Sequence, residues 1–473
     1  MASFLGGMFN LGLNRHERLK FILLTISFAF VLGSYTIAKE LKDSIFVSIV
    51  GKSYLPTAKL LVIFLLIPAA LGYSRLVDVF RRYQLLAFYC MLYGVILAVF
   101  TVLLGHQTIG LYNTQTSPYR IFGWVYYFVL EGYSPFVVSV FWAFANSVSS
   151  PKEARNCYPL MVAGSKVGGI SAALFAWYLL DHDTVLSYFG SVNHDVVSHQ
   201  ILMGVVSVML LFVPVLLVVL MRVVPGQYLH GYEAVYQLEK KHDKEKEEGD
   251  AKTSIFSGIK LLVESPYVLG IFGLVFCYET LNVVIGIQRI GLLQEASTSM
   301  AGLSAAMFWQ RFQSHFYGML LSFFGMQFLL RRFGVRRCLF MVPFLVSILL
   351  IFFVMTYSAD SIMYVFIGMA AVNYSISHPL REALYIPTTK DMKFKAKAWI
   401  DTFGTKFSKG FGCIVSNSIN FCTAGTSLAN TAYGGVFGAL MLLWFVTSWL
   451  LGKKYEKSTR NNEIIGSDIP GNM

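Results

Sequence analysis

Residues 378–410, HPLREALYIPTTKDMKFKAKAWIDTFGTKFSKG, lie between two apolar stretches at 362–372 and 411–422. They include seven lysine or arginine residues and three acidic ones. Charge inside or just below a lipid bilayer is costly and usually serves a function. The segment therefore predicts a membrane protein whose cationic cluster, at the mouth of a helical bundle, receives an anionic substrate.

The composition of the whole chain also indicates an integral membrane protein. Of its 473 residues, 56% are hydrophobic and 14% are charged, whereas soluble proteins carry about 25% charged residues. The net charge of +12 comes mostly from lysine and arginine in short loops between apolar segments. That placement orients membrane helices and is not typical of nucleic-acid binding. The six cysteines are scattered, so we expect neither a disulfide framework nor a metal site.

Twelve apolar segments come close to the length of about 20 residues that a helix needs to cross a bilayer. They are residues 20–38, 57–79, 84–104, 121–146, 159–181, 201–223, 266–288, 312–330, 337–357, 361–384, 399–422 and 433–452. The predicted outer loops at 182–200, 358–360 and 423–432 contain no lysine or arginine. The positive-inside rule then predicts that both termini are cytoplasmic. The first outer loop breaks this pattern with Lys39 and Lys42, which invites a functional interpretation.

A segment rich in charges of both signs, residues 233–252, divides the chain into six predicted spans and six more. Such a run is typical of a solvated linker or surface helix. We expect a first half at 1–223, a cytoplasmic linker at 224–255, a second half at 256–452 and a cytoplasmic tail at 453–473.

The two halves share a weak repeat. YSRLVDVFRRYQLLAF at 73–88 and GMQFLLRRFGVRRCLF at 325–340 each contain a helix end, paired arginines and the start of the next span. Two six-helix halves with matching turns are typical of a major-facilitator-like fold, whose halves are related by an axis along the membrane normal. The alternative is that any cytoplasmic turn attracts paired arginines. The sequence predicts an all-α membrane protein with twelve transmembrane helices in this six-plus-six arrangement.

Three charged residues of the first half are candidates for the binding site. Lys42 ends the first span, where it could instead extend toward the interface. Glu131 lies in the fourth span with Pro135 one turn later, and a carboxylate at that depth is usually functional. It would pair with a substrate-binding cation or carry a proton. Lys166, in the fifth span, has small neighbours suited to close helix packing, and extension toward the cytoplasm explains it equally well.

The second half contributes polar residues on its seventh and tenth spans. Glu279 and Asn282 are three residues apart on the seventh, so they share a helix face. Pro379 interrupts the tenth span. Arg381 and Tyr385 lie four residues apart on the short piece that follows.

The eleventh span carries a cationic face with Lys406 and Lys409. A positive-inside loop would explain the lysines at 390–397 but not these two, which lie within the span. Phosphate recognition needs several such donors in a partly dry site. Aromatic residues such as Tyr127 and Phe141 could stack a nucleotide base.

The sequence gives little support for nucleotide hydrolysis or a metal site. The chain has no GxxxxGK[ST] motif, so we expect transport by gradient or exchange, with neither nucleotide hydrolysis nor a cofactor. His182, His194 and His199 share the predicted outer loop at 182–200, but their spacing is not that of a metal site. An enzyme is therefore not expected.

Three stretches resemble the non-mitochondrial ATP/ADP translocase family of intracellular bacteria and plastids. Residues 379–410 resemble the family's KEMAYIP, KxKxKAxID and K-x-x-x-G motifs in succession. YTIAKELKD at 35–43 resembles its YTILRDTKD, and VVSVFWAFANS at 137–147 resembles its SVLFWGFAN. The resemblance spans nearly the whole chain.

The resemblance implies that Lys42, Glu131 and Arg381 handle a nucleotide. Arg381 stands where the family has lysine, and the family's acidic residue in the seventh span falls near Gly286, two turns after Glu279. The predicted function is ATP/ADP exchange by alternating access, with a cationic phosphate-binding cavity between the halves. The alternative is a proton-coupled symporter of nucleotides or another organic anion. A receptor that kept the fold would have little reason to hold charges within spans.

The expected partners are ATP, ADP and the lipid bilayer, without nucleic acid, and the expected state is a monomer. No N-terminal import signal is recognisable. Together with the resemblance, this predicts a location in a bacterial inner membrane.

Overall fold

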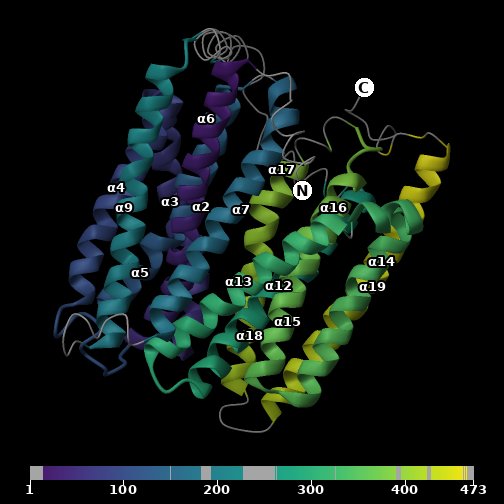
Figure 1. The fold of residues 1–473 in the computed structure, drawn as a ribbon. Coiled ribbons are helices and arrows are strands. Elements are labelled where there is room, and N and C mark those ends of the chain that lie inside the picture. Colours follow the sequence, from purple (N-terminus) through teal and green to yellow (C-terminus); the bar gives the residue numbers. More distant parts are fainter. Residues whose placement is uncertain are drawn as a thin grey trace. The chain divides into compact units, whose positions relative to one another are not determined.

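The computed structural model describes residues 14–149, 151–182, 193–226, 229, 262, 264–324, 326–389, 392, 396–422, 428–461, 463 and 465. This part of the chain is helical almost throughout, and an isolated parallel bridge joins Thr388 to Ile465 (Figure 1). The main helices are α2 (Arg15–Ile49), α3 (Leu55–Val79), α4 (Arg82–Leu104), α5 (Ile121–Glu131), α6 (Ser139–Ser147), α7 (Pro151–Asp181), α9 (His194–Val223), α12 (Pro266–Ala296), α13 (Met300–Phe324), α14 (Met326–Thr356), α15 (Ala359–Val372), α16 (His378–Leu384), α17 (Lys397–Trp399), α18 (Thr405–Cys422) and α19 (Leu428–Asn461).

Nine helical segments of the described residues are long and apolar enough to cross a membrane. They are Arg15–Ile49, Arg82–Leu104, Ile121–Ser147, Met161–Asp181, His194–Val223, Pro266–Ala296, Arg332–Thr356, Ala359–Leu384 and Ala429–Asn461. The three remaining predicted spans coincide with the helices α3, α13 and α18, which are not among these nine. The total of twelve spans therefore stays a prediction.

Several predicted boundaries were wrong. The first span does not end at residue 38, because α2 continues to Ile49 and so contains Lys39 and Lys42. The outer loop predicted at 182–200 ends earlier, since α9 begins at His194. The helix α13 begins at Met300 rather than at residue 312.

The described residues fall into two compact units. Unit 1 lies within Met1–Lys52, Phe64–Gly249 and Ser297–Phe312, and unit 2 lies within Ser53–Ile63, Asp250–Ala296 and Gln313–Met473. Two helices, α3 and α13, are thus divided between the units. The predicted linker at 224–255 lies mostly outside the described residues, so its boundaries stay a prediction.

In unit 1, the helix α2 packs along α7, α9 and α5 (Figure 1). The glycines of α7 allow the closest of these approaches, as the small residues around Lys166 predicted. A methyl group on Gly168 would lie 2.5 Å from the carbonyl oxygen of Ala29, and one on Gly164 would lie 2.2 Å from the side chain of Thr25. Because backbone atoms cannot move aside easily, Gly168 fixes the distance between α2 and α7.

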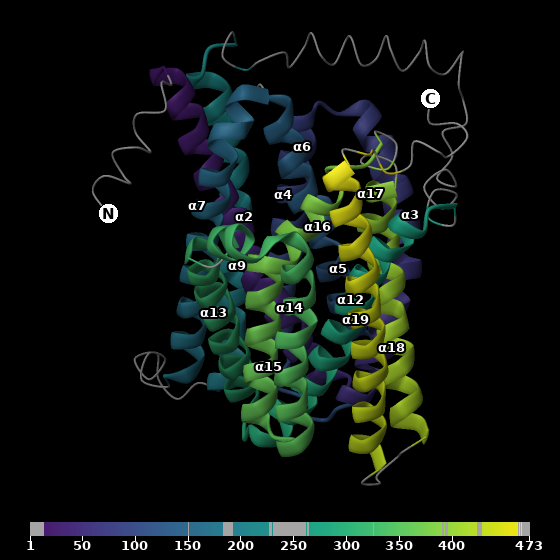
Figure 2. The ribbon, with the colours of Figure 1, turned by 90° about the vertical axis from the view of Figure 1, so that its right-hand side faces the viewer.

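In unit 2, the helix α12 packs on α15, α18 and α19, while α14 packs on α15 and α19 (Figure 2). The contact between α12 and α18 is also close, because a methyl group on Gly412 would lie 2.9 Å from the carbonyl oxygen of Thr280. The Thr280 hydroxyl donates to the carbonyl oxygen of Ser408 at 3.1 Å. These contacts fix the register of α12 against α18, and with it the positions of Glu279 and Lys409.

Among the described residues, π-helical turns interrupt the helices at Ser134–Val138, Asn373–Ser377 and Ile400–Gly404. The first contains Pro135 and the second precedes Pro379. A proline has no N–H to donate and its ring collides with the carbonyl group four residues earlier, so a wider turn relieves the clash. These two interruptions occupy the fourth and tenth predicted spans, which correspond in the two predicted halves. Paired interruptions of this kind point to binding sites in transporters.

The contact at Gly168 gives a first prediction. Gly168→Ala should lower the free energy of unfolding by about 1–3 kcal/mol, because the added methyl group overpacks the contact between α2 and α7. Thermal unfolding of the detergent-solubilised protein measures this. The matched control is Gly438→Ala on α19, where a methyl group meets no atom within 4 Å. Equal stability of the two variants would contradict the close contact.

Candidate functional site

Unit 1 holds a buried ion pair between Lys42 on α2 and Glu131 at the end of α5. The Lys42 ammonium group donates to Oε1 of Glu131 and lies 3.6 Å from Oδ1 of Asp43. It also lies 4.7 Å from the centre of the Tyr127 ring. The Lys42 side chain is 8% exposed and that of Glu131 is 26% exposed. Two residues that are 89 positions apart in the sequence, both predicted for the site, therefore meet.

The local fold explains why Glu131 faces this lysine. The helix α5 ends at Glu131, and the π-helical turn begins at Ser134. Pro135 cannot donate to the Glu131 carbonyl oxygen, so the regular helix cannot continue there. On the other side, Tyr127 packs against Phe46 of α2 with ring centres 4.8 Å apart. The ring contact holds α5 against α2 one turn before the carboxylate.

Unit 2 holds a second lysine–carboxylate pair, between Glu279 on α12 and Lys409 on α18. The Lys409 Nζ atom lies 3.6 Å from Oε2 of Glu279, and the side chains are 46% and 15% exposed respectively. Among the described residues, the Glu279 Oε2 atom is buried and has no hydrogen-bond donor. Buried polar atoms normally have a partner, so this oxygen is an exception, and the assignment of Glu279 to the binding site stays a prediction.

Three other predicted site residues lie on α7, α12 and α18. Lys166 is half-buried on α7, and Asn282 is half-buried one turn after Glu279 on α12. Lys406 is half-buried on α18, three residues before Lys409. The expectation of several lysines facing one phosphate thus stays a prediction.

The segment around Arg381 contains an ion pair that sequence reasoning missed. Lys397 on α17 lies 2.5 Å from Oε2 of Glu382 on α16. The same ammonium group lies 5.7 Å from the centre of the Tyr385 ring, which is buried. Burial raises the pKa of the Tyr385 phenol, so this group stays neutral. Arg381 itself is half-buried beside this pair, on α16.

A second buried pair on α2 was also missed. Arg311 on α13 donates from Nε to Oε1 of Glu40 at 2.7 Å, and its Nη2 atom lies 2.5 Å from the same oxygen. The Glu40 side chain is only 3% exposed. The signal was present in YTIAKELKD, where a carboxylate stands two residues before Lys42 just after an apolar run. Positions two residues apart point to different faces of a helix, so α2 pairs with two different elements.

The histidines are not a loop cluster. His199 is fully buried on α9, where its Nε2 atom lies 2.8 Å from the hydroxyl of Ser304. Ser304 in turn donates to the hydroxyl of Ser44 on α2 at 2.9 Å. Tyr127 and Phe141 are both fully buried within unit 1, and their stacking on a base stays a prediction.

The comparisons with known proteins agree with this picture. The family model described as TLC ATP/ADP transporter matches residues 7–455. The chain belongs to this family. It is therefore an integral membrane transporter with several membrane-crossing helices, and not an enzyme, as predicted.

The chain is similar to curated ADP,ATP carrier proteins along most of its length. It is 23% identical over 463 residues to ADP,ATP carrier protein 3 of Rickettsia bellii (strain RML369-C), covering 86% of this chain and 88% of the relative. It is 22% identical over 505 residues to ADP,ATP carrier protein 3 of Rickettsia prowazekii (strain Madrid E), covering 94% and 96%.

Solved structures share its fold at low sequence identity. A bacterial homologue of the iron transporter ferroportin has a TM-score of 0.59 and 13% identity, with 93% of this chain and 98% of that chain covered. A D-xylose–proton symporter has a TM-score of 0.54 and 12% identity, with 92% and 96% covered. The fold is accordingly major-facilitator-like, as predicted.

The buried pair in unit 1 gives a second prediction. Lys42→Met leaves the Glu131 carboxylate without this cation, and the free energy of unfolding should fall by about 3 kcal/mol. The double variant Lys42→Met/Glu131→Gln removes both charges and should recover most of the loss. Thermal and denaturant unfolding in detergent micelles measure both effects.

The matched control is Arg336→Met, which breaks an ion pair with Glu456 whose side chains are 47% and 57% exposed. Exposed pairs contribute at most about 1 kcal/mol. Equal losses at Lys42 and Arg336 would show that burial does not set the strength of the Lys42–Glu131 pair.

Proposed function

We propose that this chain carries adenine nucleotides across a membrane and exchanges ATP for ADP by alternating access. The observation that carries the proposal is the buried Lys42–Glu131 pair. The family assignment and the curated relatives, which are named ADP,ATP carrier proteins, support adenine nucleotides as the cargo. The major-facilitator-like fold supports alternating access.

The pair explains how an empty carrier tolerates a buried lysine. Without substrate, the Glu131 carboxylate balances the Lys42 charge. A nucleotide phosphate is a stronger acceptor for charge-assisted hydrogen bonds than a neutral group and carries more charge than a carboxylate. It would therefore compete with Glu131 for the ammonium group. The lysine stays paired in both states, so binding does not require an isolated charge in the protein interior.

Unit 2 supports the same kind of binding. The Lys409 ammonium group lies at 3.6 Å from Glu279, which is long for a direct hydrogen bond, and is nearly half exposed. A phosphate needs less rearrangement to reach this lysine than to reach Lys42. Further residues proposed to contact the nucleotide are Lys166, Asn282, Arg381, Tyr385 and Lys406.

One observation favours a second candidate, proton-coupled uptake of a nucleotide or another organic anion. If phosphate displaces Glu131 from Lys42, the carboxylate loses its cation in a low-dielectric interior, where protonation relieves the cost of its charge. A proton would then enter with the anion. Exchange instead requires that Glu131 stays ionised and that a second nucleotide takes the place of the first at Lys42.

A transport assay separates these functions. Uptake of labelled ATP into proteoliposomes should require internal ADP and be indifferent to a protonophore. Lys42→Ala should lower this uptake by about ten- to a hundredfold, because it removes a charge-assisted bond to phosphate worth about 1.5–3 kcal/mol. The matched control Lys457→Ala, an exposed lysine near the end of α19, should leave uptake unchanged.

Protonophore-sensitive uptake that needs no internal ADP would identify the symporter. Unchanged ATP/ADP exchange in the Lys42→Ala variant would contradict the assignment of Lys42 to the binding site.

We also propose that the chain has twelve spans with both termini in the cytoplasm, and that it is a monomer. In this proposal, the helices α3, α13 and α18 are the three spans beyond the nine apolar ones. The alternation of lysine and arginine between loops supports the orientation.

A natural cysteine tests this topology. Cys422 at the end of α18 is exposed, while the other five cysteines are buried. In the proposed topology it faces outward, so a membrane-impermeant maleimide should label intact cells expressing the protein. Cys422→Ser should abolish this labelling. Labelling that appears only after the membrane is permeabilised would reverse the orientation of α18.

A further inference from the structure

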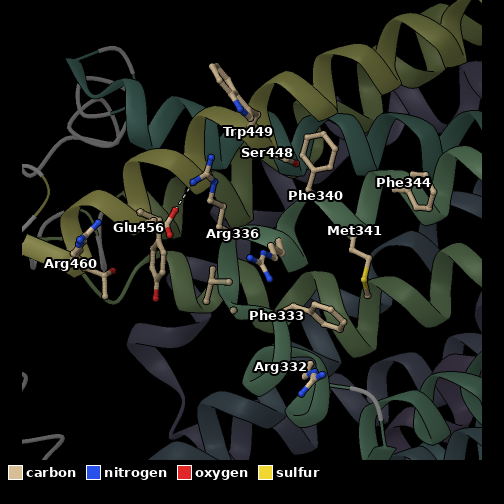
Figure 3. Close-up of a pocket in the computed structure, with 15 residues that line it drawn as sticks. Arg332, Phe333, Arg336, Phe340, Met341, Phe344, Ser448, Trp449, Glu456 and Arg460 are labelled. Atoms are coloured by element: carbon tan, nitrogen blue, oxygen red, sulfur yellow. Dashed lines mark hydrogen bonds and ion pairs between the residues drawn. The ribbon is translucent and has the colours of Figure 1, made fainter.

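Unit 2 contains a cavity of about 1150 Å³ between the arginine-rich end of α14 and the end of α19 (Figure 3). It takes no part in the proposed nucleotide site. Four arginines and one glutamate line it, namely Arg332, Arg336, Arg337, Arg460 and Glu456. Glu456 pairs with Arg336 at 2.6 Å. The cavity therefore carries a clear excess of positive charge.

The backbone around Gly334 shapes this end of the cavity. Gly334 has a φ of 73°, which breaks the regular helix between Arg332 and Arg336. That region of φ favours glycine. Gly452 lets α19 approach α14 closely, since a methyl group there would lie 3.4 Å from the Cα atom of Arg336. The two glycines thus bring the guanidinium groups of α14 beside α19.

The other end of the cavity is apolar. Along α14, Phe340 and Phe344 follow the arginines and are 41% and 54% exposed. On α19, Trp449 comes before Glu456 in the sequence and is 49% exposed. Figure 3 shows these rings on one side of the cavity, away from Arg460. Charge and apolar surface are therefore separated along the length of the two helices.

The apolar surface continues beyond the cavity. On α14, Ile348 and Ile351 are 51% and 58% exposed, and on α19, Val446 is 53% exposed. Large apolar side chains exposed on membrane-crossing helices are solvated by lipid chains. The cavity thus joins a cationic end to a surface suited to hydrocarbon.

We propose that this cavity binds an anionic phospholipid. Its phosphate would accept hydrogen bonds from Arg332 and Arg337, since guanidinium groups match phosphate geometry. One acyl chain would lie along Phe340 and Phe344, and Trp449 would sit at the level of the headgroup, where tryptophan is enriched. Basic pockets between membrane helices recognise acidic headgroups in this way. A nucleotide or free phosphate shares the phosphate chemistry but leaves the apolar surface unused.

Trp449 provides the readout. The full-length protein is titrated in mixed micelles with phosphatidylglycerol or phosphatidylcholine, each brominated in its acyl chains, and tryptophan fluorescence is recorded. The anionic lipid should quench at an at least tenfold lower mole fraction, as about 1 kcal/mol for each arginine near a headgroup implies. Trp449→Phe should remove this selective component. Because Trp449 is half exposed, phenylalanine there preserves the fold.

The double variant Arg332→Gln/Arg337→Gln should remove the preference for the anionic lipid. The ratio of the mole fractions at which the two lipids quench should then be nearly one. Both side chains are exposed, and the Arg336–Glu456 pair remains. The matched control is Arg81→Gln/Arg82→Gln, which removes the same charge from the related turn before α4 and should retain the preference.

Three results would overturn the proposal. Equal quenching by both lipids in the unaltered protein would show that the cavity does not select charge. An equal loss in the control variant would show that only net charge matters. Displacement of the anionic lipid by inorganic phosphate or ATP at matched concentration would make the cavity a site for soluble anions.

Discussion

The arrangement of unit 1 depends on the cost of holding the Lys42 charge away from water. An isolated ammonium group in a low-dielectric interior is unfavourable by several kcal/mol or more. The fold meets this requirement with Glu131, with Asp43 at 3.6 Å and with the face of the Tyr127 ring. Asp43 is on α2 itself, whereas Glu131 and Tyr127 are on α5 and can reach Lys42 only at a particular distance between α2 and α5. The ring contact of Phe46 with Tyr127 and the early end of α5 supply that distance.

The same requirement explains which site residues the sequence could predict. A charge within an apolar span is visible without any structure, so Lys42, Glu131 and Glu279 could be identified individually. Their pairing could not, because it depends on the register of helices that are far apart in the chain. Lys409 meets Glu279 through the bond between Thr280 and Ser408, and no local pattern encodes that register.

The residues that were not predicted show the same limit of inference from the sequence. Glu40 and Arg311 are 271 residues apart and form a buried pair, and no local pattern in the sequence indicates that the two would meet. His199 was placed in a loop because the apolar pattern of α9 weakens toward its N-terminus. In the structure, Asn193 caps this helix and accepts from the backbone N–H of Val196. The cap at Asn193 and the serine partner of His199 hold this end of α9, although the sequence there lacks the apolar pattern on which the prediction relied.

The charged groups of the chain thus divide into two kinds with different physical roles. Those within spans, such as Lys42 and Glu40, have carboxylate or guanidinium partners because water cannot solvate them. Those at the ends of α14 and α19, such as Arg332 and Arg337, are exposed. In the proposed function, a phosphate takes the place of Glu131 beside Lys42, so the lysine charge stays paired with and without substrate.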